Sequence, residues 1–405
     1  MKRKLIFILL ILLAIVGYFM WFHKDKTLKF IPENADFVVM IDVKKTSQQY
    51  VFSLVKHPSL WFGDSKLTFK NNGIKVPDFI QIFHLKETDF SEWYSIFEIS
   101  DKDDFQKYLK AKGFKLTKNN IYSKDQFSIK IAGSKCIVGF SNKDFENSIS
   151  KFLNSEDYKK LNADQLINNS IGSLSHLSGS QIWNFSIDLN DDDIEIKNIS
   201  DQNRFSSIIS DLEKKVSFLK LKLDSKNIQK VSRLFNKKLN DSLKIKSVFA
   251  VSELELVNDK IISYGYDDNF NEVEKVSYQK IVQPNYAINL QSSEPIKIWD
   301  YFKNKKWINA QNQFTLIPFQ PNAISQNGNE ISITSTRKPI RLEKNRAGNF
   351  VFIRNSSFLN NSLKTLSKTE KKLISNLEYV FYGNLSENYY LKLKFKKGDL
   401  PIILR

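Results

Sequence analysis

The residue types best able to do chemistry in this 405-residue chain are one cysteine, four histidines and a short acidic segment. Asp188, Asn190 and Asp192 have the D-x-N-x-D spacing that opens a calcium-binding loop. The sixth position of such a loop should be glycine but is Asp193, and the twelfth should be glutamate but is Ile199. A solvated turn between two strands is therefore favoured over a metal site.

The other chemically capable side chains lie in patterns typical of structural residues. Cys136 precedes two apolar residues in a strand pattern, which favours a buried small side chain over a catalytic thiol. His84 lies in another strand pattern, and His57 marks a helix end; both favour structural roles. No nucleophile elbow, H-E-x-x-H, Walker A or G-x-G-x-x-G motif occurs. We therefore predict no catalytic, cofactor-binding or metal-binding residue, although convergent carboxylates would leave an envelope hydrolase open.

The net charge of +17 suggests an anionic partner, but the residue types argue against nucleic acid. Eight of the 61 basic residues are arginine, whereas base readout and bidentate phosphate binding favour arginine over lysine. The basic segments 337–341 and 364–372 are interpreted as solvated faces, with lipid headgroups or an acidic partner as alternatives. The sequence therefore predicts no nucleic-acid partner.

The N-terminal segment has the pattern of a membrane anchor. Three basic residues within Met1–Lys4 precede an uncharged apolar run, Leu5–Phe22, of 18 residues. At about 1.5 Å per residue a helix of this length extends about 27 Å, which nearly spans a bilayer core. The basic cluster predicts a cytoplasmic N-terminus, with the bulk of the chain in the bacterial periplasm. A single-pass inner-membrane anchor is favoured over a cleaved signal peptide because no small-residue cleavage site follows.

Strand and helix patterns alternate beyond residue 27 without the regular β-α-β-α order of a parallel sheet, so we predict an α+β fold. The predicted organisation is a cytoplasmic stub and anchor over 1–27, a first extracytoplasmic α+β region over 28–270, and a second over 271–405. Strands are expected near 36–43, 79–85, 92–99, 127–131, 136–140, 180–188, 246–256, 260–266, 377–383 and 389–396. Helices are expected near 46–55, 100–113, 141–153, 205–215 and 228–239.

Two passages suggest an internal duplication with an offset of 213 residues. Asn142 and Phe145 in the first passage correspond to Asn355 and Phe358 in the second, and a strand leads into a helix in each. The proline-led segments 31–35 and 283–287 would then open the two copies. We therefore expect Phe145 and Phe358 to occupy equivalent core positions, unless the match reflects only an Ile-, Phe- and Asn-rich composition.

Two segments also resemble a known family. The segment Ile31–Val39 (IPENADFVV) lies just beyond the apolar run, and the strand Ser247–Leu256 is followed by a turn, Val257–Lys260, and a strand, Ile261–Tyr266. Both are similar to an uncharacterised membrane-anchored envelope protein family of Bacteroidetes-type bacteria. The resemblance implies a location and an architecture, and it carries no catalytic motif.

The sequence favours a non-enzymatic accessory or scaffold subunit that docks on other envelope membrane proteins, in a complex for protein export or assembly. Its first expected partner is the lipid bilayer, through residues 5–22. The alternatives are a periplasmic binding module that carries a hydrophobic or polymeric envelope ligand between its halves and, third, an envelope hydrolase. No cofactor is expected.

Overall fold

The computed structural model shows a mostly β protein, with 53% strand and 20% helix. It describes residues 22–56, 72–117, 120–140, 145–147, 149, 158–198, 203–234, 243–317, 322–336, 338, 340, 342, 348–359, 371 and 374–396. Every strand pairing described in these ranges is antiparallel. The predicted α+β class is wrong, because strand far outweighs helix. Most expected helices exist, but they are short elements lying on sheets that contain more strands than the sequence pattern indicated.

The chain forms two compact units, the first ending at Asp191 and the second beginning at Asp192. The strands within each unit pair in antiparallel order, and each unit has its own buried clusters. The expected division at 270/271 falls within the turn that joins two long strands, β14 (Ile245–Tyr266) and β15 (Glu272–Ser292). These two strands are paired along nearly their whole length, so both belong to the second unit.

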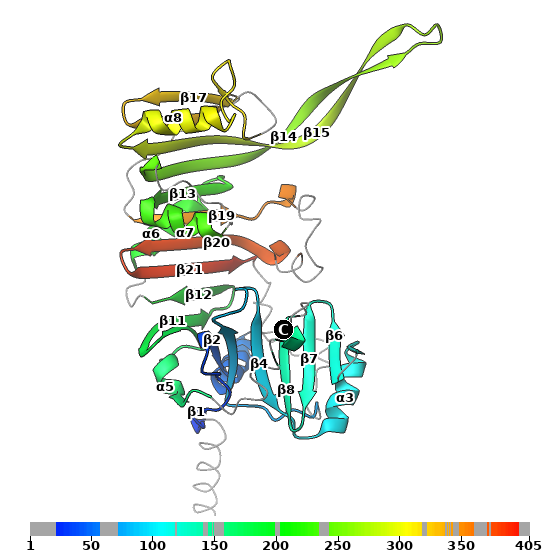
Figure 1. Ribbon diagram of the computed structural model, residues 1–405, viewed down its shortest axis with the longest axis vertical. Helices are drawn as coiled ribbons and strands as arrows, with labels where there is room; N and C mark the ends of the chain where they lie inside the picture. The colour runs from blue at the N-terminus through cyan, green and yellow to red at the C-terminus, as the bar shows by residue number, and fades with distance from the viewer. Residues whose placement is uncertain are drawn as a thin grey trace, which may run out of the picture. The chain divides into compact units, whose positions relative to one another are not determined.

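The sheet of the first unit has the strand order β11–β10–β2–β3–β4–β8–β7–β6–β5 (Figure 1). A separate two-stranded pairing joins β1 to β9. The strands are β1 (Thr27–Leu28), β2 (Ala35–Asp42), β3 (Phe79–Leu85), β4 (Trp93–Glu98), β5 (Lys115–Leu116), β6 (Ile121–Lys124), β7 (Phe127–Ala132), β8 (Lys135–Phe140), β9 (Leu161–Asn162), β10 (Gly172–Ser178) and β11 (Gln181–Leu189). The helices are α2 (Val43–Lys56), α3 (Lys102–Ala111) and α5 (Ala163–Leu166).

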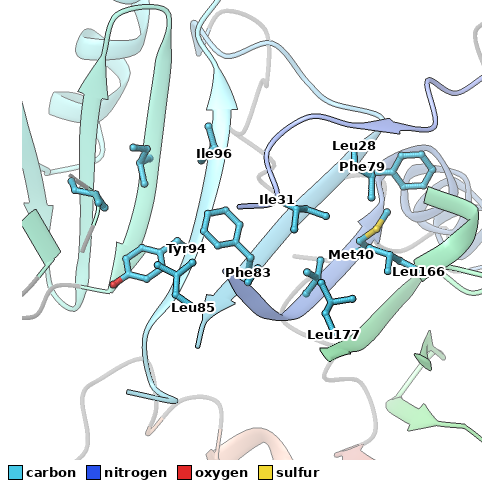
Figure 2. Close-up of a cluster of buried hydrophobic side chains, with 14 of the residues drawn as sticks. Leu28, Ile31, Met40, Phe79, Phe83, Leu85, Tyr94, Ile96, Leu166 and Leu177 are labelled. Carbon is cyan, nitrogen blue, oxygen red and sulfur yellow. The ribbon is translucent and has the colours of Figure 1, made fainter. Parts of the chain in front are cut away.

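One face of the central strands carries the main core of the first unit. Val38 and Met40 alternate with half-buried residues along β2, as expected for a strand with one face in a core. Phe83 of β3 and Ile31, from the segment before β2, complete the centre of the cluster (Figure 2). Burial of these side chains fixes the register of β2 against β3, because a one-residue slip would expose them.

Helix α3 covers a second cluster over β6, β7 and β8. Asp101 caps the helix by accepting a hydrogen bond from the backbone N–H of Asp104. The helix ends before Gly113, whose φ of +81° suits glycine, as the sequence predicted. Phe105 of α3 packs in this cluster together with Cys136 of β8.

The sheet of the second unit has the strand order β12–β21–β20–β19–β13–β14–β15–β18–β17–β16. Its further strands are β12 (Asp193–Lys197), β13 (Leu219–Asp224), β16 (Gln313–Phe314), β17 (Asn322–Asn327), β18 (Glu330–Ser335), β19 (Asn349–Arg354), β20 (Leu377–Leu385) and β21 (Asn388–Phe395). The helices are α6 (Asn203–Glu213), α7 (Ser225–Leu234), α8 (Pro295–Asn304) and the 3-10 helix η4 (Ser357–Leu359).

Two helices cover separate clusters on this sheet. Ile298 and Phe302 of α8 pack among residues of β15, β17 and β18. Helix α6 packs on β19, β20 and β21. The guanidinium of Arg354 donates to three backbone carbonyls at the C-terminal end of α6 and so caps the helix. The second unit is therefore also built from an antiparallel sheet with helices packed on it.

A phenylalanine packs against a strand glycine in each unit. Phe205 of α6 stacks on Tyr390 and lies so close to Gly383, the cross-strand partner of Tyr390, that a Cβ at that position would be 2.6 Å from the ring. In the first unit the ring of Phe145 lies in the same way over Gly139 and its cross-strand partner, Tyr94. Both glycines are therefore required by close packing of a ring on the sheet.

The expected duplication is not supported at its key residues. Phe145 is helical and 3% exposed, whereas Phe358 lies in η4 and is 39% exposed. The proline-led segments also differ, because Pro32 forms an isolated bridge with Tyr158 while Pro284 lies inside β15. The proposed equivalence of Phe145 and Phe358 is therefore wrong, and the short sequence match reflects composition.

Among the described residues, no helix combines the length and the apolar character needed to cross a bilayer. The expected anchor, residues 5–22, lies outside the described residues except for Phe22. Membrane anchoring therefore stays a prediction from the sequence.

Replacing Gly383 by alanine should destabilise the second unit. The new Cβ would collide with the ring of Phe205, and overpacking of this kind typically costs about 1–3 kcal/mol. Gly265→Ala is the matched control, because there the nearest atoms belong to the flexible end of Lys275, and its effect should stay within about 0.5 kcal/mol. Urea unfolding followed by circular dichroism measures both. Equal stability of the two variants would contradict the packing argument.

Candidate functional site

The distal halves of β14 and β15 form a two-stranded arm that extends beyond the sheet of the second unit (Figure 1). We define the arm as residues Leu256–Val282. Nearer the sheet, β14 pairs with β13 through Ser252, and β15 pairs with β18 from Ala287. Within the arm the two strands pair with each other, and no other strand pairing is described for them. Nearly every arm residue between Asn258 and Lys280 is exposed.

One face of the arm carries its exposed tyrosine rings. Side chains at alternate positions share a face, and directly opposite residues of paired strands share it too. The register places Ile262 opposite Val276 and Lys260 opposite Tyr278, so these residues lie on one face. We call this face the aromatic face. Its apolar side chains are between 45% and 72% exposed: Leu256, Ile262, Tyr264, Tyr266, Val276 and Tyr278.

The opposite face of the arm lacks aromatic side chains. Between Asp259 and Gln279 it carries serine, acidic, lysine and glutamine side chains, with Ile261 and Val273 as its exposed apolar members. Both faces carry polar side chains, because Lys260, Glu272, Glu274 and Lys280 lie among the rings of the aromatic face. The exposed tyrosines of the arm nevertheless lie on one face only, and no other described element covers them. Exposed aromatic side chains gathered on one face are typical of a protein-interaction site.

The tip of the arm is a rigid acidic turn. The carboxylate of Asp267 accepts hydrogen bonds from the backbone N–H groups of Asn269 and Asn271 and from the side-chain amide of Asn271. These hydrogen bonds, chiefly the one from the Asn271 backbone, hold the pKa of Asp267 below its ordinary value. Phe270 has a φ of +62° and is 86% exposed. A positive φ is unusual for a bulky residue and points to a constrained, outward-facing ring.

Charge is segregated along the arm. The tip, Tyr264–Glu274, holds four acidic side chains and no basic one. The remaining arm residues hold three lysines, Lys260, Lys275 and Lys280, and one acid, Asp259. The arm thus carries a net charge of −2 in a chain whose net charge is +17. None of these charged side chains takes part in an ion pair among the described residues.

The turn of this hairpin differs from the one that the sequence predicted. A turn was expected at 257–260, but β14 runs without a break from Ile245 to Tyr266, and the turn lies at 267–271. Asp267, Asp268 and Asn269 were available turn signals there. Pro284 is tolerated inside β15 because β18 pairs with that strand only from Ala287 onward.

The acidic segment considered as a calcium loop lies at the link between the two units. Asp188 belongs to β11, and Asp192 forms an ion pair with Lys394 at 2.7 Å. Within the part of the chain that the structure describes, no group of three or more His, Cys, Asp or Glu side chains is placed to hold a metal ion. This segment therefore gives no candidate metal centre.

His84 belongs to an aromatic row that crosses five strands of the first unit. Successive cross-strand partners place Trp183, His176, Phe37, His84 and Trp93 side by side. The rings of Phe37 and His176 stack with centroids 4.6 Å apart, and those of His176 and Trp183 stack at 5.1 Å. No sequence pattern predicted this row, because the five residues come from separate segments and meet only through strand register.

The imidazole of His84 is buried and fully engaged. Its Nδ1 lies 2.6 Å from the Asp36 carboxylate, and its Nε2 lies 3.1 Å from the backbone carbonyl of Asp89. With both ring nitrogens held, His84 links strand β2 to the loop after β3. This arrangement agrees with the expected structural role, as does the position of Cys136. Burial raises the pKa of the Cys136 thiol to about 12, so it stays protonated and unreactive.

The carboxylates of the second unit that gather in one place are held by cations. Lys392 Nζ lies 2.8 Å from Asp193 and 3.3 Å from Glu195, and Lys197 Nζ lies 2.9 Å from Glu195. Burial would raise the pKa of Glu195, but hydrogen bonds from Lys197 and Tyr390 outweigh it and keep the pKa low. Charges neutralised in this way stabilise structure, and the low pKa of Glu195 does not suit a general acid.

A surface hollow of about 170 Å³ in the first unit is lined by charged residues that pair with one another. Lys75 bonds Glu98 at 2.8 Å, and Lys29 lies 3.5 Å from Asp25. Asp78 accepts from the backbone N–H of Asp25 at 2.7 Å. Because these groups satisfy one another, the hollow presents few unengaged charges to a ligand. Several residues considered in the sequence analysis lie outside the described residues. They are His57, Arg337, Arg341 and most of the basic segment 364–372.

In comparisons with protein-family models, curated proteins and solved structures, nothing matches this chain. The resemblance of Ile31–Val39 and Ser247–Tyr266 to envelope proteins therefore stays a prediction. The candidate site rests on the geometry of the arm, with the aromatic row of the first unit as the second candidate.

Proposed function

We propose that this protein is a non-enzymatic, membrane-anchored accessory or scaffold subunit of an envelope complex, and that its β14–β15 arm mediates assembly. One observation supports this most strongly: three tyrosine rings and three aliphatic side chains are exposed along one face of the arm. Tyrosine combines a large apolar ring with a polar hydroxyl. This explains its enrichment in protein interfaces, which are solvated in the free protein and buried in the complex.

Energetics also favour a partner for the arm. A two-stranded ribbon is at best marginally stable in water without a third strand or a packed face. Tyr264, Tyr266 and Tyr278 are exposed to solvent, and no described residue buries their rings. Binding a protein to this face would bury these rings and stabilise the ribbon. The same projection would be a liability for aggregation if it had no physiological partner.

The membrane part of the proposal rests on the apolar run 5–22 and on the basic residues that precede it. This pattern favours a single-pass anchor in the bacterial inner membrane, with the arm on the periplasmic side. Handling of exported proteins fits such a location, and it remains part of the proposal.

Labelling of the arm tip tests this topology. Phe270→Cys places a thiol at a strongly exposed position, whereas the native Cys136 is buried. A membrane-impermeant maleimide added to spheroplasts should therefore label the Phe270→Cys variant and not the native chain, and the labelled protein should sediment with membranes. Labelling that requires lysis of the spheroplasts would contradict a periplasmic arm.

Site-specific photo-crosslinking in cells tests the function of the arm. A photoreactive residue in place of Tyr278, on the aromatic face, should give a discrete protein adduct. The same residue in place of the neighbouring Gln279, on the opposite face, should give at least about tenfold less adduct. A partner bound to the aromatic face would not contact side chains that point away from it. Any discrete adduct, with another protein or with a second copy, supports assembly through the arm. No adduct at either position would refute it.

A second function, binding of a hydrophobic or polymeric envelope ligand, is supported by the aromatic row of the first unit. Trp183 is 46% exposed at one end of the row, and Phe90, which packs against Phe37 and Trp93, is also exposed. Exposed aromatic rings held rigidly by stacked neighbours suit an apolar or ring-shaped ligand.

Fluorescence titration distinguishes this second function from the first. Soluble peptidoglycan fragments serve as the polymeric probe, and phospholipid vesicles serve as the hydrophobic one. If the row binds either, Trp183→Ala should weaken binding about tenfold, the equivalent of about 1.4 kcal/mol. Phe127→Ala, which alters an exposed ring on β7, is the matched control and should bind normally. Saturable binding to neither probe would remove this candidate.

A further inference from the structure

We infer that the arm binds the arm of a second copy of this chain, in an antiparallel two-fold arrangement with the aromatic faces in contact. This inference rests on the proposed role of the arm in assembly and names its partner. Two features of residues Leu256–Val282 carry it: the distribution of charge and the distribution of apolar side chains.

Charge distribution selects the antiparallel orientation. The tip carries four acidic residues, Asp267, Asp268, Glu272 and Glu274. The rest of the arm, which we call the stem, carries three lysines and one acidic residue. In an antiparallel pair, the acidic tip of each arm lies beside the lysine-bearing stem of the other. In a parallel pair, the two acidic tips would lie together, and their repulsion would oppose binding. The same complementarity occurs twice in the two-fold pair, because each contact is repeated by symmetry.

Apolar side chains are arranged to match this orientation. They extend along the whole aromatic face, from Leu256 at the stem to Tyr266 at the tip, rather than clustering at one end. Ten residue steps of strand extend about 33 Å, so two overlapping arms would share a long contact. The Ile262–Val276 pair lies near the middle of the arm and would lie close to the two-fold axis.

Each arm would stabilise the other in this arrangement. A second ribbon supplies the packed face that a two-stranded ribbon lacks in isolation. It also covers tyrosine rings that nothing described within the chain covers. A two-stranded ribbon twists strongly, so the two aromatic faces would wind about each other and keep contact along their length. The second unit would then carry a self-complementary dimer contact at a distance from its sheet.

Cysteine cross-linking of the full-length chain in mild detergent tests the geometry, because Cys136 is buried and does not compete. A short bis-maleimide should cross-link Val276→Cys with itself across the two-fold axis. Phe270→Cys alone and Leu256→Cys alone should not cross-link, since each lies far from its own copy. The double variant with both cysteines should cross-link as a dimer. Efficient cross-linking of Phe270→Cys alone would show a parallel pair and overturn the inference.

Sedimentation of the same full-length chain tests the contact itself. Tyr278→Asp places a charge on the aromatic face and should weaken dimerisation at least tenfold, whereas Gln279→Asp places the same charge on the opposite face and should not. Both variants retain residues 1–22, so a difference between them reports on the arm. A monomeric native chain, or equal effects of the two variants, would overturn the inference. If the Tyr278 photo-adduct in cells contains a different protein and never a second copy, the inference fails while the proposed assembly function stands.

Discussion

The pairing of β14 with β15 is the interaction on which the second unit and its candidate site both depend. The proximal halves lie in the middle of the sheet, with β13 on one side and β18 on the other. The distal halves continue the same register beyond the sheet as the arm. Because one continuous ladder of backbone hydrogen bonds supports both parts, the sheet supplies the stability that an isolated ribbon lacks. The position of the tip is thereby tied to the core.

The buried polar groups considered as functional candidates in the two units are engaged in structural contacts. His84 is held by Asp36 and by a backbone carbonyl, and Glu195 is held by two lysines and a tyrosine. Such groups stabilise elements because leaving a buried polar atom without a partner is costly. The arm shows the reverse pattern, with exposed rings and charged side chains that form no ion pair in the described chain. A surface whose chemistry is not used internally is the natural place to seek a partner, and this contrast directs the functional proposal to the arm.

Sequence patterns located most elements with one buried face. The strand expected at 79–85 is confirmed as β3, and the helix that ends before Gly113 is confirmed as α3. Burial of one face imposes the period of two or of 3.6 residues that such predictions detect. The pattern failed for Glu272–Lys280, because a strand exposed on both faces need not alternate. It also failed at Phe358, where a local resemblance to the segment around Phe145 did not reflect a shared core position.

The sequence by itself determined the apolar run 5–22, the scarcity of catalytic motifs, and the local strands and helices that bury one face. It also contained the turn signals at 267–271, although their role depended on knowing which strands pair. Only the tertiary structure decided that β14 and β15 continue past their sheet, that tyrosines from both strands share one face, and that five separate segments form the aromatic row. Strand register decides these features, and register is set by contacts between residues distant in sequence, which no local pattern encodes.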